Sequence, residues 1–151
     1  MKPYPFSIVR IAEIVRTGKC LEEGEVLEFT KHGASGLGLD VNAALKDGQY
    51  LAMRFVVHCS DAARPHSYES GFLLAGPRVR GIGYSPIERK KKYKVHIPKG
   101  WHENILDPNL VGDDANRHEA LPDFSPTDLK DFTKKSAARW NIDLEFHEGL
   151  L

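Results

Sequence analysis

The chain has 151 residues, and 21 Lys and Arg side chains balance 21 Asp and Glu side chains, so the formal net charge is zero. One domain over residues 1–151 is expected, because domains commonly hold about 100–200 residues. Apolar residues make up 41% of the chain and charged residues 28%, which excludes a disordered or fibrous protein. The uncharged apolar runs hold only a few residues, far short of the roughly 20 that cross a bilayer, so no membrane partner is expected.

Two cysteines, Cys20 and Cys59, are too few for a disulfide framework, and the first residues lack the apolar stretch of a secretory signal. These features predict a cytoplasmic location. Cys59 follows His58, but neighbours on a strand face opposite sides, so burial of Cys59 is a better prediction than nucleophilic catalysis.

The zero net charge hides an uneven distribution along the chain. Residues 78–104 carry eight Lys and Arg but two acidic side chains, a net charge of +6, whereas residues 105–128 carry one and six, a net charge of −5. Such asymmetry is typical of an anion-binding surface beside a solvated loop. Pairing of the two blocks across a turn is the alternative.

The first predicted element is an amphipathic helix over residues 7–17, because Ile8, Ile11, Ala12 and Val15 recur at helical spacing. The pattern then changes to the alternation of half-buried strands, which predicts strands at residues 27–29 and 37–43, joined by a turn at 31–36. Further strands are expected at residues 50–59, 72–75, 78–84 and 92–97, bounded by Gly and Pro. Their short spacing favours antiparallel pairing.

Residues 98–126 are polar and acidic with frequent Pro, Asn, Asp and Gly, which predicts a long loop with one short helical turn. A second helix is expected to begin with Ser125 as its N-cap and to bury Leu129, Phe132, Ser136 and Trp140. A last strand is expected over residues 142–146. These elements predict an α+β domain, a curved antiparallel sheet with an N-terminal and a C-terminal helix packed on one face.

The basic stretch contains the main candidate site residues. Alternation in a strand over residues 92–97 puts Lys92, Lys94 and His96 on one face, and in the preceding strand it puts Arg78, Arg80 and Tyr84 on one face. A hairpin between the strands would join the two sets into a positive patch. The alternative is a solvated hairpin tip whose lysines protect an edge strand from pairing with another chain.

Such a patch suits phosphodiester chemistry without a metal, in which cations hold phosphate oxygens and an imidazole transfers protons. We expect His96 and His102 to be catalytic. The expected phosphate-binding residues are Arg78, Arg80, Lys92, Lys94 and Lys99, and Tyr84 and Trp101 are expected to stack on bases. Trp101 as an anchor that seats its loop on the sheet is the alternative.

A metal site is the weaker prediction for the same region. His96, His102 and Glu103, with Asp107 beyond, have side chains that bind transition metals, but Pro98 and Gly100 interrupt them and no regular element fixes their geometry. No metal and no other cofactor is therefore expected. The other histidines, His32, His58, His66, His118 and His147, are expected in strands or polar turns without a catalytic role.

Residues 80–104, followed by the helix that begins at Ser125, resemble small bacterial TumE-like toxins. The matching positions are Arg80, Tyr84, His96 and His102, although that family has adjacent histidines after a Tyr-Asp pair where this chain has Tyr84-Ser85-Pro86 and then lysines. The resemblance implies a toxin that acts on RNA and has an inhibitory protein partner, the antitoxin.

Two functions from different classes follow. The first is a nucleic-acid-acting protein, a metal-independent ribonuclease of toxin type, whose partner is RNA or another polyanion. The alternative is a non-enzymatic interaction module of a phage or mobile element that binds another protein through exposed strands and the acidic loop. Steep weakening of binding with salt would favour the first.

Overall fold

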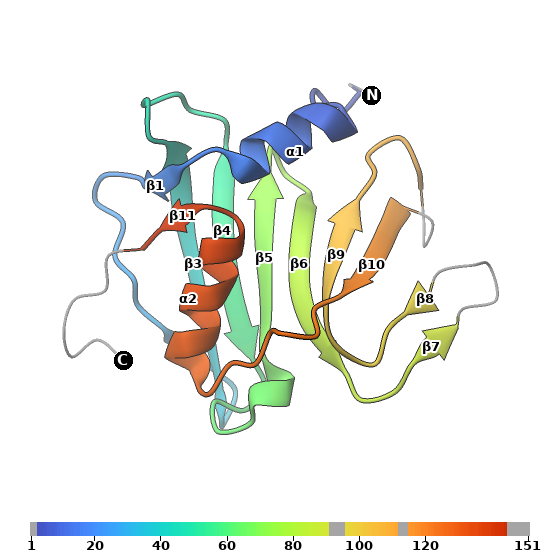
Figure 1. Cartoon of the computed structure of the whole chain (residues 1–151). Coiled ribbons are helices and arrows are strands. Elements are labelled where there is room, and N and C mark those ends of the chain that lie inside the picture. The colour runs from blue at the N-terminus through green and yellow to red at the C-terminus, as the bar shows by residue number, and fades with distance from the viewer. Residues whose placement is uncertain (1–2, 91–95, 112–114, 145–151) are drawn as a thin grey trace.

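A curved sheet with one open face forms the centre of the molecule (Figure 1). The computed structural model describes residues 3–90, 96–111 and 115–144. The strands run in the order β10-β9-β6-β5-β4-β3-β1-β11, with β2 paired to β3. Neighbouring strands are antiparallel except β1 and β11, which are parallel. The predicted α+β class, with an N-terminal and a C-terminal helix, is confirmed.

The strands of this sheet are β1 (Lys19–Leu21), β2 (Thr30–His32), β3 (Gly36–Leu45), β4 (Met53–Cys59), β5 (Glu69–Leu74), β6 (Arg78–Ser85), β9 (Gly100–Leu106), β10 (Asn116–Ala120) and β11 (Ile142–Asp143). Most predicted strands are thus present with shifted ends. Residues 27–29 are an exception, because the strand there begins only at Thr30.

Helix α1 (Ile8–Arg16) matches its predicted range and buries Ile11, Ile14 and Val15 against the sheet. The Ser7 hydroxyl accepts a hydrogen bond from the Arg10 amide at 3.1 Å, which caps the first turn. The other end is closed by Lys19, which is completely buried. Its ammonium donates to the carbonyl oxygens of Ile14, Val15 and Thr17 at 2.5–3.0 Å, and so satisfies the last turn of the helix.

Helix α2 (Leu129–Arg139) is capped by Asp128, which corrects the prediction of Ser125. The Asp128 carboxylate accepts from the Asp131 amide at 2.8 Å, while the Asp131 carboxylate accepts from the Thr127 amide at 2.9 Å. The reciprocal cap therefore lies three residues later than predicted. The predicted buried stripe is confirmed, with Leu129, Phe132, Ser136 and Trp140 all buried.

Both helices cover the same face of the sheet (Figure 1), which we call the inner face. The core lies between them and this face. The Trp140 ring packs edge-on against Phe55 of β4 at 6.1 Å between ring centroids, and it also contacts Phe72 of β5. Alternation places Phe55 and Cys59 inward, so burial of Cys59 is confirmed.

The predicted loop at residues 98–126 was wrong, because this segment contains β9 and β10. Strand β9 pairs with β6 along its length, and β10 pairs with β9 at the edge. The alternation of β9 is hard to recognise because the inward position between Trp101 and Ile105 is occupied by Glu103. Its side chain is 6% exposed and pairs with Arg139 of α2 at 3.0 Å, so a charged residue takes a core position.

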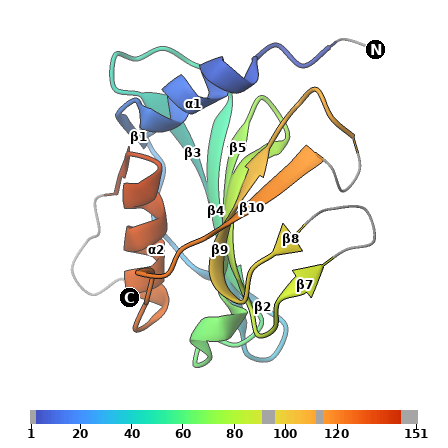
Figure 2. The ribbon, with the colours of Figure 1, turned by 45° about the vertical axis from the view of Figure 1, so that its right-hand side comes forward.

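A separate two-stranded ribbon, β7 (Arg89–Lys90) and β8 (His96–Ile97), connects β6 to β9. In Figure 2 this ribbon lies on the side of the sheet away from α2. Of the predicted strand over residues 92–97, Lys92 and Lys94 lie outside the described residues, as does Phe146 of the predicted last strand. No helix in the described part of the chain has the length and apolar character to span a membrane.

Candidate active site

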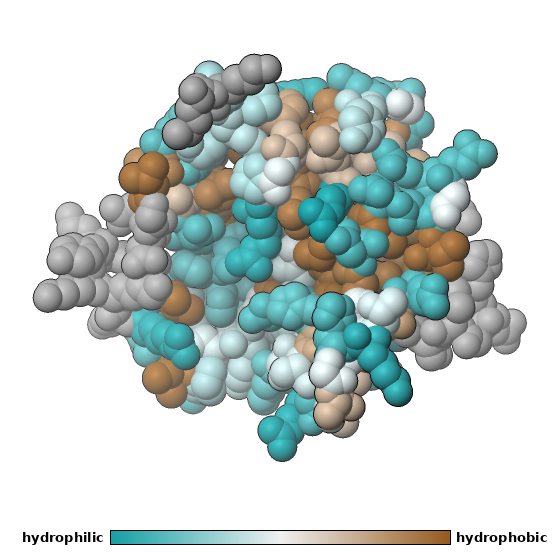
Figure 3. All heavy atoms as spheres, turned by 180° about the vertical axis from the view of Figure 1, so that it is seen from behind, coloured by the Kyte–Doolittle hydropathy of each residue, from teal (hydrophilic) through white to brown (hydrophobic). Residues whose placement is uncertain are grey.

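The face opposite the helices, here called the open face, carries hydrophilic residues over a broad area, with hydrophobic patches between them (Figure 3). A bulge in β6 decides which arginine reaches it. Phe72 pairs with Arg80 but Leu73 pairs with Arg78, so the register shifts by one residue at Val79. Arg78 therefore lies on the open face and Arg80 on the inner face, which corrects the prediction that both share a face.

Glycines form the floor beside Arg78. Gly71 of β5 pairs with Gly81 of β6, and Gly83 follows on the same face of β6. A Cβ atom built on Gly81 would lie 3.1 Å from Arg78 Nε and 3.2 Å from Cζ, so the guanidinium lies flat on the bare backbone. Among the described residues, Arg78 has no hydrogen-bond or ion-pair partner. Its donors are therefore directed to solvent or to a ligand.

Glu69 of β5 lies on one side of this floor. Its carboxylate is 3.0 Å from Nε2 of His58 on β4, and both side chains are about half exposed. The Cγ atom of Glu69 is 4.0 Å from the position of a Cβ on Gly83, so the side chain borders the gap above that glycine. Glu69 is thus an accessible carboxylate, oriented by an imidazole and open to a further contact.

His102 of β9 lies on the other side, paired with Gly83. Because strands are about 4.8 Å apart, the backbones of Glu69 and His102 are about 10 Å apart, with no side chain between them on β6. His102 is 7% exposed, and its Nδ1 donates to the Gly100 carbonyl at 3.2 Å. Burial lowers the pKa of His102, while the Gly100 carbonyl and the Glu69 charge act to raise it. The bond to Gly100 leaves Nε2 for proton exchange.

Asn104 adds an acceptor next to the glycine floor. It pairs with Gly81, and its Oδ1 is buried with no hydrogen-bond partner in the described residues. Such an orphan acceptor is costly and indicates a missing donor. On the far side of His58, a hollow of about 210 Å³ opens on the same face. Its polar lining comes from Thr30, His32, Asp40 and His58.

The predicted surface of Arg80, Lys92, Lys94, His96 and His102 is not assembled as expected. Arg80 is buried on the inner face and His102 faces the other way. His96 is on the ribbon, exposed, with Nε2 2.7 Å from the Glu88 carboxylate. Lys99 is exposed, and Lys92 and Lys94 lie outside the described residues. Among the predicted residues that the structure describes, Arg78 and His102 share the open face of the sheet.

The predicted stacking residues do meet, but at the end of the inner face. Tyr84 pairs with Trp101, and their ring centroids are 5.3 Å apart. The Tyr84 ring stacks on His66 at 3.8 Å, while Trp101 packs against Phe124 and Phe132. Trp101 is therefore an anchor, but it joins strand β9 to α2 instead of seating a loop on the sheet. Base stacking by Tyr84 stays a prediction.

The alternative metal site is not assembled either. Glu103 and His102 are neighbours on β9 and face opposite sides of the sheet, and Glu103 is held by Arg139. In the described part of the chain, no group of three or more His, Cys, Asp or Glu side chains is arranged to hold a metal ion.

Sequence reasoning missed His58, Glu69 and Asn104 as site residues. The glycines were the available signal, because Gly71, Gly81 and Gly83 stand within strand patterns where a bare position indicates close approach of another group. Comparison of the chain with protein-family models, with curated proteins and with solved structures gives no match.

Proposed function

We propose that the chain is a metal-independent ribonuclease that cleaves single-stranded RNA on the open face of its sheet. The observation that carries this proposal is the Arg78 guanidinium, which has no partner among the described residues and lies on a glycine floor. At the Gly83 end of that floor, the Glu69 carboxylate is on one side and the His102 imidazole on the other. Arginine binds phosphate through two parallel hydrogen bonds, and the bare backbone leaves room for the phosphate.

The proposed reaction is an attack by the ribose 2′-hydroxyl on the neighbouring phosphate. Glu69 takes the 2′-hydroxyl proton as the new O–P bond forms, and His102 in its protonated form gives a proton from Nε2 to the 5′-oxygen as the P–O5′ bond breaks. Arg78 stabilises the charge on the non-bridging oxygens. The products are a 2′,3′-cyclic phosphate and a 5′-hydroxyl end.

Neighbouring features provide places for the rest of the substrate. The hollow beside His58 has imidazole walls from His32 and His58, and unstacked bases commonly pack on such rings. The ribbon of β7 and β8 lies on this side of the sheet (Figure 2) and belongs to the segment with a net charge of +6. A positive segment near the site raises the local concentration of a polyanion. An inhibitory protein partner, the antitoxin of the TumE-like resemblance, would act by covering this face.

Cleavage of a labelled single-stranded RNA in the presence of a chelator tests the proposal. The parent chain should produce 2′,3′-cyclic ends and should leave the matching DNA intact, because DNA lacks the attacking hydroxyl. Arg78→Met, Glu69→Gln and His102→Gln should each lower the rate about 100-fold or more. The matched control is Arg54→Met, which removes an arginine of the same face that is already paired with Asp40.

Three results would contradict the proposal. They are loss of cleavage on chelation, equal cleavage of DNA, and full activity of the Glu69→Gln and His102→Gln variants. Absence of RNA binding at low salt would instead favour the non-enzymatic interaction module.

A further inference from the structure

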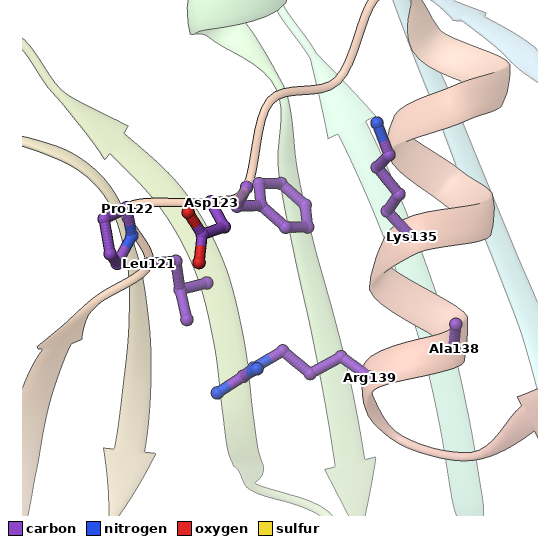
Figure 4. A pocket seen from close by; sticks show the side chains of 7 residues that line it. Leu121, Pro122, Asp123, Lys135, Ala138 and Arg139 are labelled. Atoms are coloured by element: carbon purple, nitrogen blue, oxygen red, sulfur yellow. The ribbon is translucent and has the colours of Figure 1, made fainter.

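A cleft on the inner side of the molecule, separate from the candidate active site, opens between residues 121–124 and α2 (Figure 4). It has a volume of about 580 Å³, within the range of pockets that hold small molecules. One wall is apolar, with Leu121, Pro122 and Phe124. The other wall is α2, from which Lys135, Ala138 and Arg139 line the cleft.

Arg139 is held in place by a buried carboxylate. Glu103 accepts from Nε and Nη2 of Arg139, both at 3.0 Å, and from the Trp140 indole at 2.8 Å. Glu103 is almost fully buried, whereas the Arg139 side chain is 41% exposed. The guanidinium is thus fixed on one edge, and Figure 4 shows it extending into the cleft toward Leu121. A pre-positioned donor of this kind binds an anion with little loss of side-chain entropy.

Arg80 of β6 is a buried cation on the same inner face, close enough to Glu103 and Arg139 for their charges to act on it. It is 8% exposed, and within the described residues its one hydrogen bond runs from Nη1 to the Val79 carbonyl at 2.8 Å. No carboxylate of the described residues lies within ion-pair distance of it. Burial lowers the pKa of Arg80, and the charges that act on it are Glu103, Arg117, Glu119 and Arg139. Glu103, the buried carboxylate among them, is already bonded to Arg139 and to the Trp140 indole.

We propose that this cleft binds a small amphipathic anion, with a carboxylate-type head at the Arg139 and Arg80 end and an apolar body against Leu121 and Phe124. The head supplies the missing negative charge, since a buried cation is costly unless it is paired. The apolar wall stabilises a short hydrocarbon chain or a ring. The site is on the opposite side of the sheet from Arg78, so it does not depend on ribonuclease activity.

Titration with octanoate and with octanamide, followed by amide NMR shifts, tests the proposal, because the two molecules share a body and differ in charge. Octanoate should shift the amides of residues 121, 123, 124, 138 and 139 and leave those of His102 and Gly83 unchanged. Octanamide should bind at least tenfold more weakly. Equal binding of both, shifts centred on the open face, or no shifts at the solubility limit of octanoate would overturn the proposal.

Two variants locate the head group. Arg80→Met should remove the preference for octanoate over octanamide. Asp123→Asn, at an exposed position of the cleft wall, should tighten octanoate binding severalfold because it removes a repelling charge. If Arg80→Met does not fold, Asp123→Asn decides alone. An unchanged preference in folded Arg80→Met, or unchanged octanoate affinity in Asp123→Asn, would contradict the assignment of the head group.

Discussion

Arg78 and Arg80 are two residues apart in β6 and lie on opposite faces of the sheet. Regular alternation would put both on one face, but the bulge between their pairing positions adds one residue to β6. The two arginines consequently have different surroundings. Arg78 lies on glycines of the open face and has no partner in the described part of the chain, whereas Arg80 is buried on the inner face. One irregular position therefore separates the candidate active site from the proposed anion site.

The position of the Arg78 guanidinium depends on the absence of a side chain at Gly81. In Gly81→Ala, the new Cβ would lie 3.1 Å from Nε, so the guanidinium must shift. Because misplacement of a catalytic group by about 1 Å costs up to about 100-fold, we expect RNA cleavage to fall about tenfold or more. The contact is with the end of a flexible side chain, so unfolding free energy should change by less than about 1 kcal/mol.

A double variant isolates this effect. Gly81→Ala should cause no further loss of cleavage when Arg78 is already Met, since both changes act through the same guanidinium. Equal losses in the two backgrounds would show that the methyl group acts on the substrate directly.

The pH dependence of cleavage should report His102. Burial lowers the pKa of His102 below the usual 6.5. As the proton donor, His102 is active only when protonated, and its protonated fraction falls as pH rises through the lowered pKa. We therefore expect kcat/KM to be highest in mildly acidic solution and to fall about tenfold per pH unit above neutrality.

His58→Gln should keep this alkaline limb, because His58 supports Glu69 and donates no proton to the leaving group. A rate that increases toward neutral pH would instead make His102 the general base.

Periodic segments of the sequence were sufficient to predict the helices, their buried faces and the central strands. The strand at residues 100–106 was not predicted because Glu103 takes a core position that its pairing with Arg139, 36 residues away, makes tolerable. No local pattern contains that partner. The strand at residues 116–120 lies at the edge of the sheet and has no buried residue, so it lacks an apolar alternation. Ser125 was predicted as the N-cap of α2 in place of Asp128, because both residue types are good caps and the two positions are only three residues apart.

The candidate site was predictable only in part. Arg78 and His102 were selected for charge and for proton transfer, but their neighbours come from the pairing of β4, β5, β6 and β9. His58 and Glu69 are 11 positions apart in sequence and become partners through that register. The bulge at Val79 puts Arg80 on the face of the sheet opposite to Arg78. Strict alternation along the sequence predicts the same face for both residues.

The Trp140 indole is expected to contribute to stability through Glu103. In Trp140→Phe, the packing on Phe55 and Phe72 is largely kept, but Glu103 Oε2 loses the 2.8 Å hydrogen bond. We expect a loss of about 1–3 kcal/mol in unfolding free energy, measured by urea denaturation. The double variant with Glu103→Leu should lose less unfolding free energy than the sum of the two single losses, because both changes remove the same hydrogen bond. Simple additivity would show that the indole acts by packing alone.

Lys19 should make the stability of the chain depend on pH above neutrality. In Lys19→Met, three carbonyl groups at the end of α1 lose their donor, so we expect a loss of about 1–3 kcal/mol at pH 7.

Burial lowers the pKa of Lys19 to about 8, whereas the group has a value of 10.5 when exposed. Between these values the unfolded chain binds a proton that the folded chain does not, so stability rises with pH across this window. The unfolding free energy of the parent, compared with that of Lys19→Met, should therefore increase from pH 8 to pH 10. If the unfolding free energies of the parent and of Lys19→Met differ by the same amount at pH 8 and at pH 10, the three carbonyl groups keep Lys19 protonated over this range.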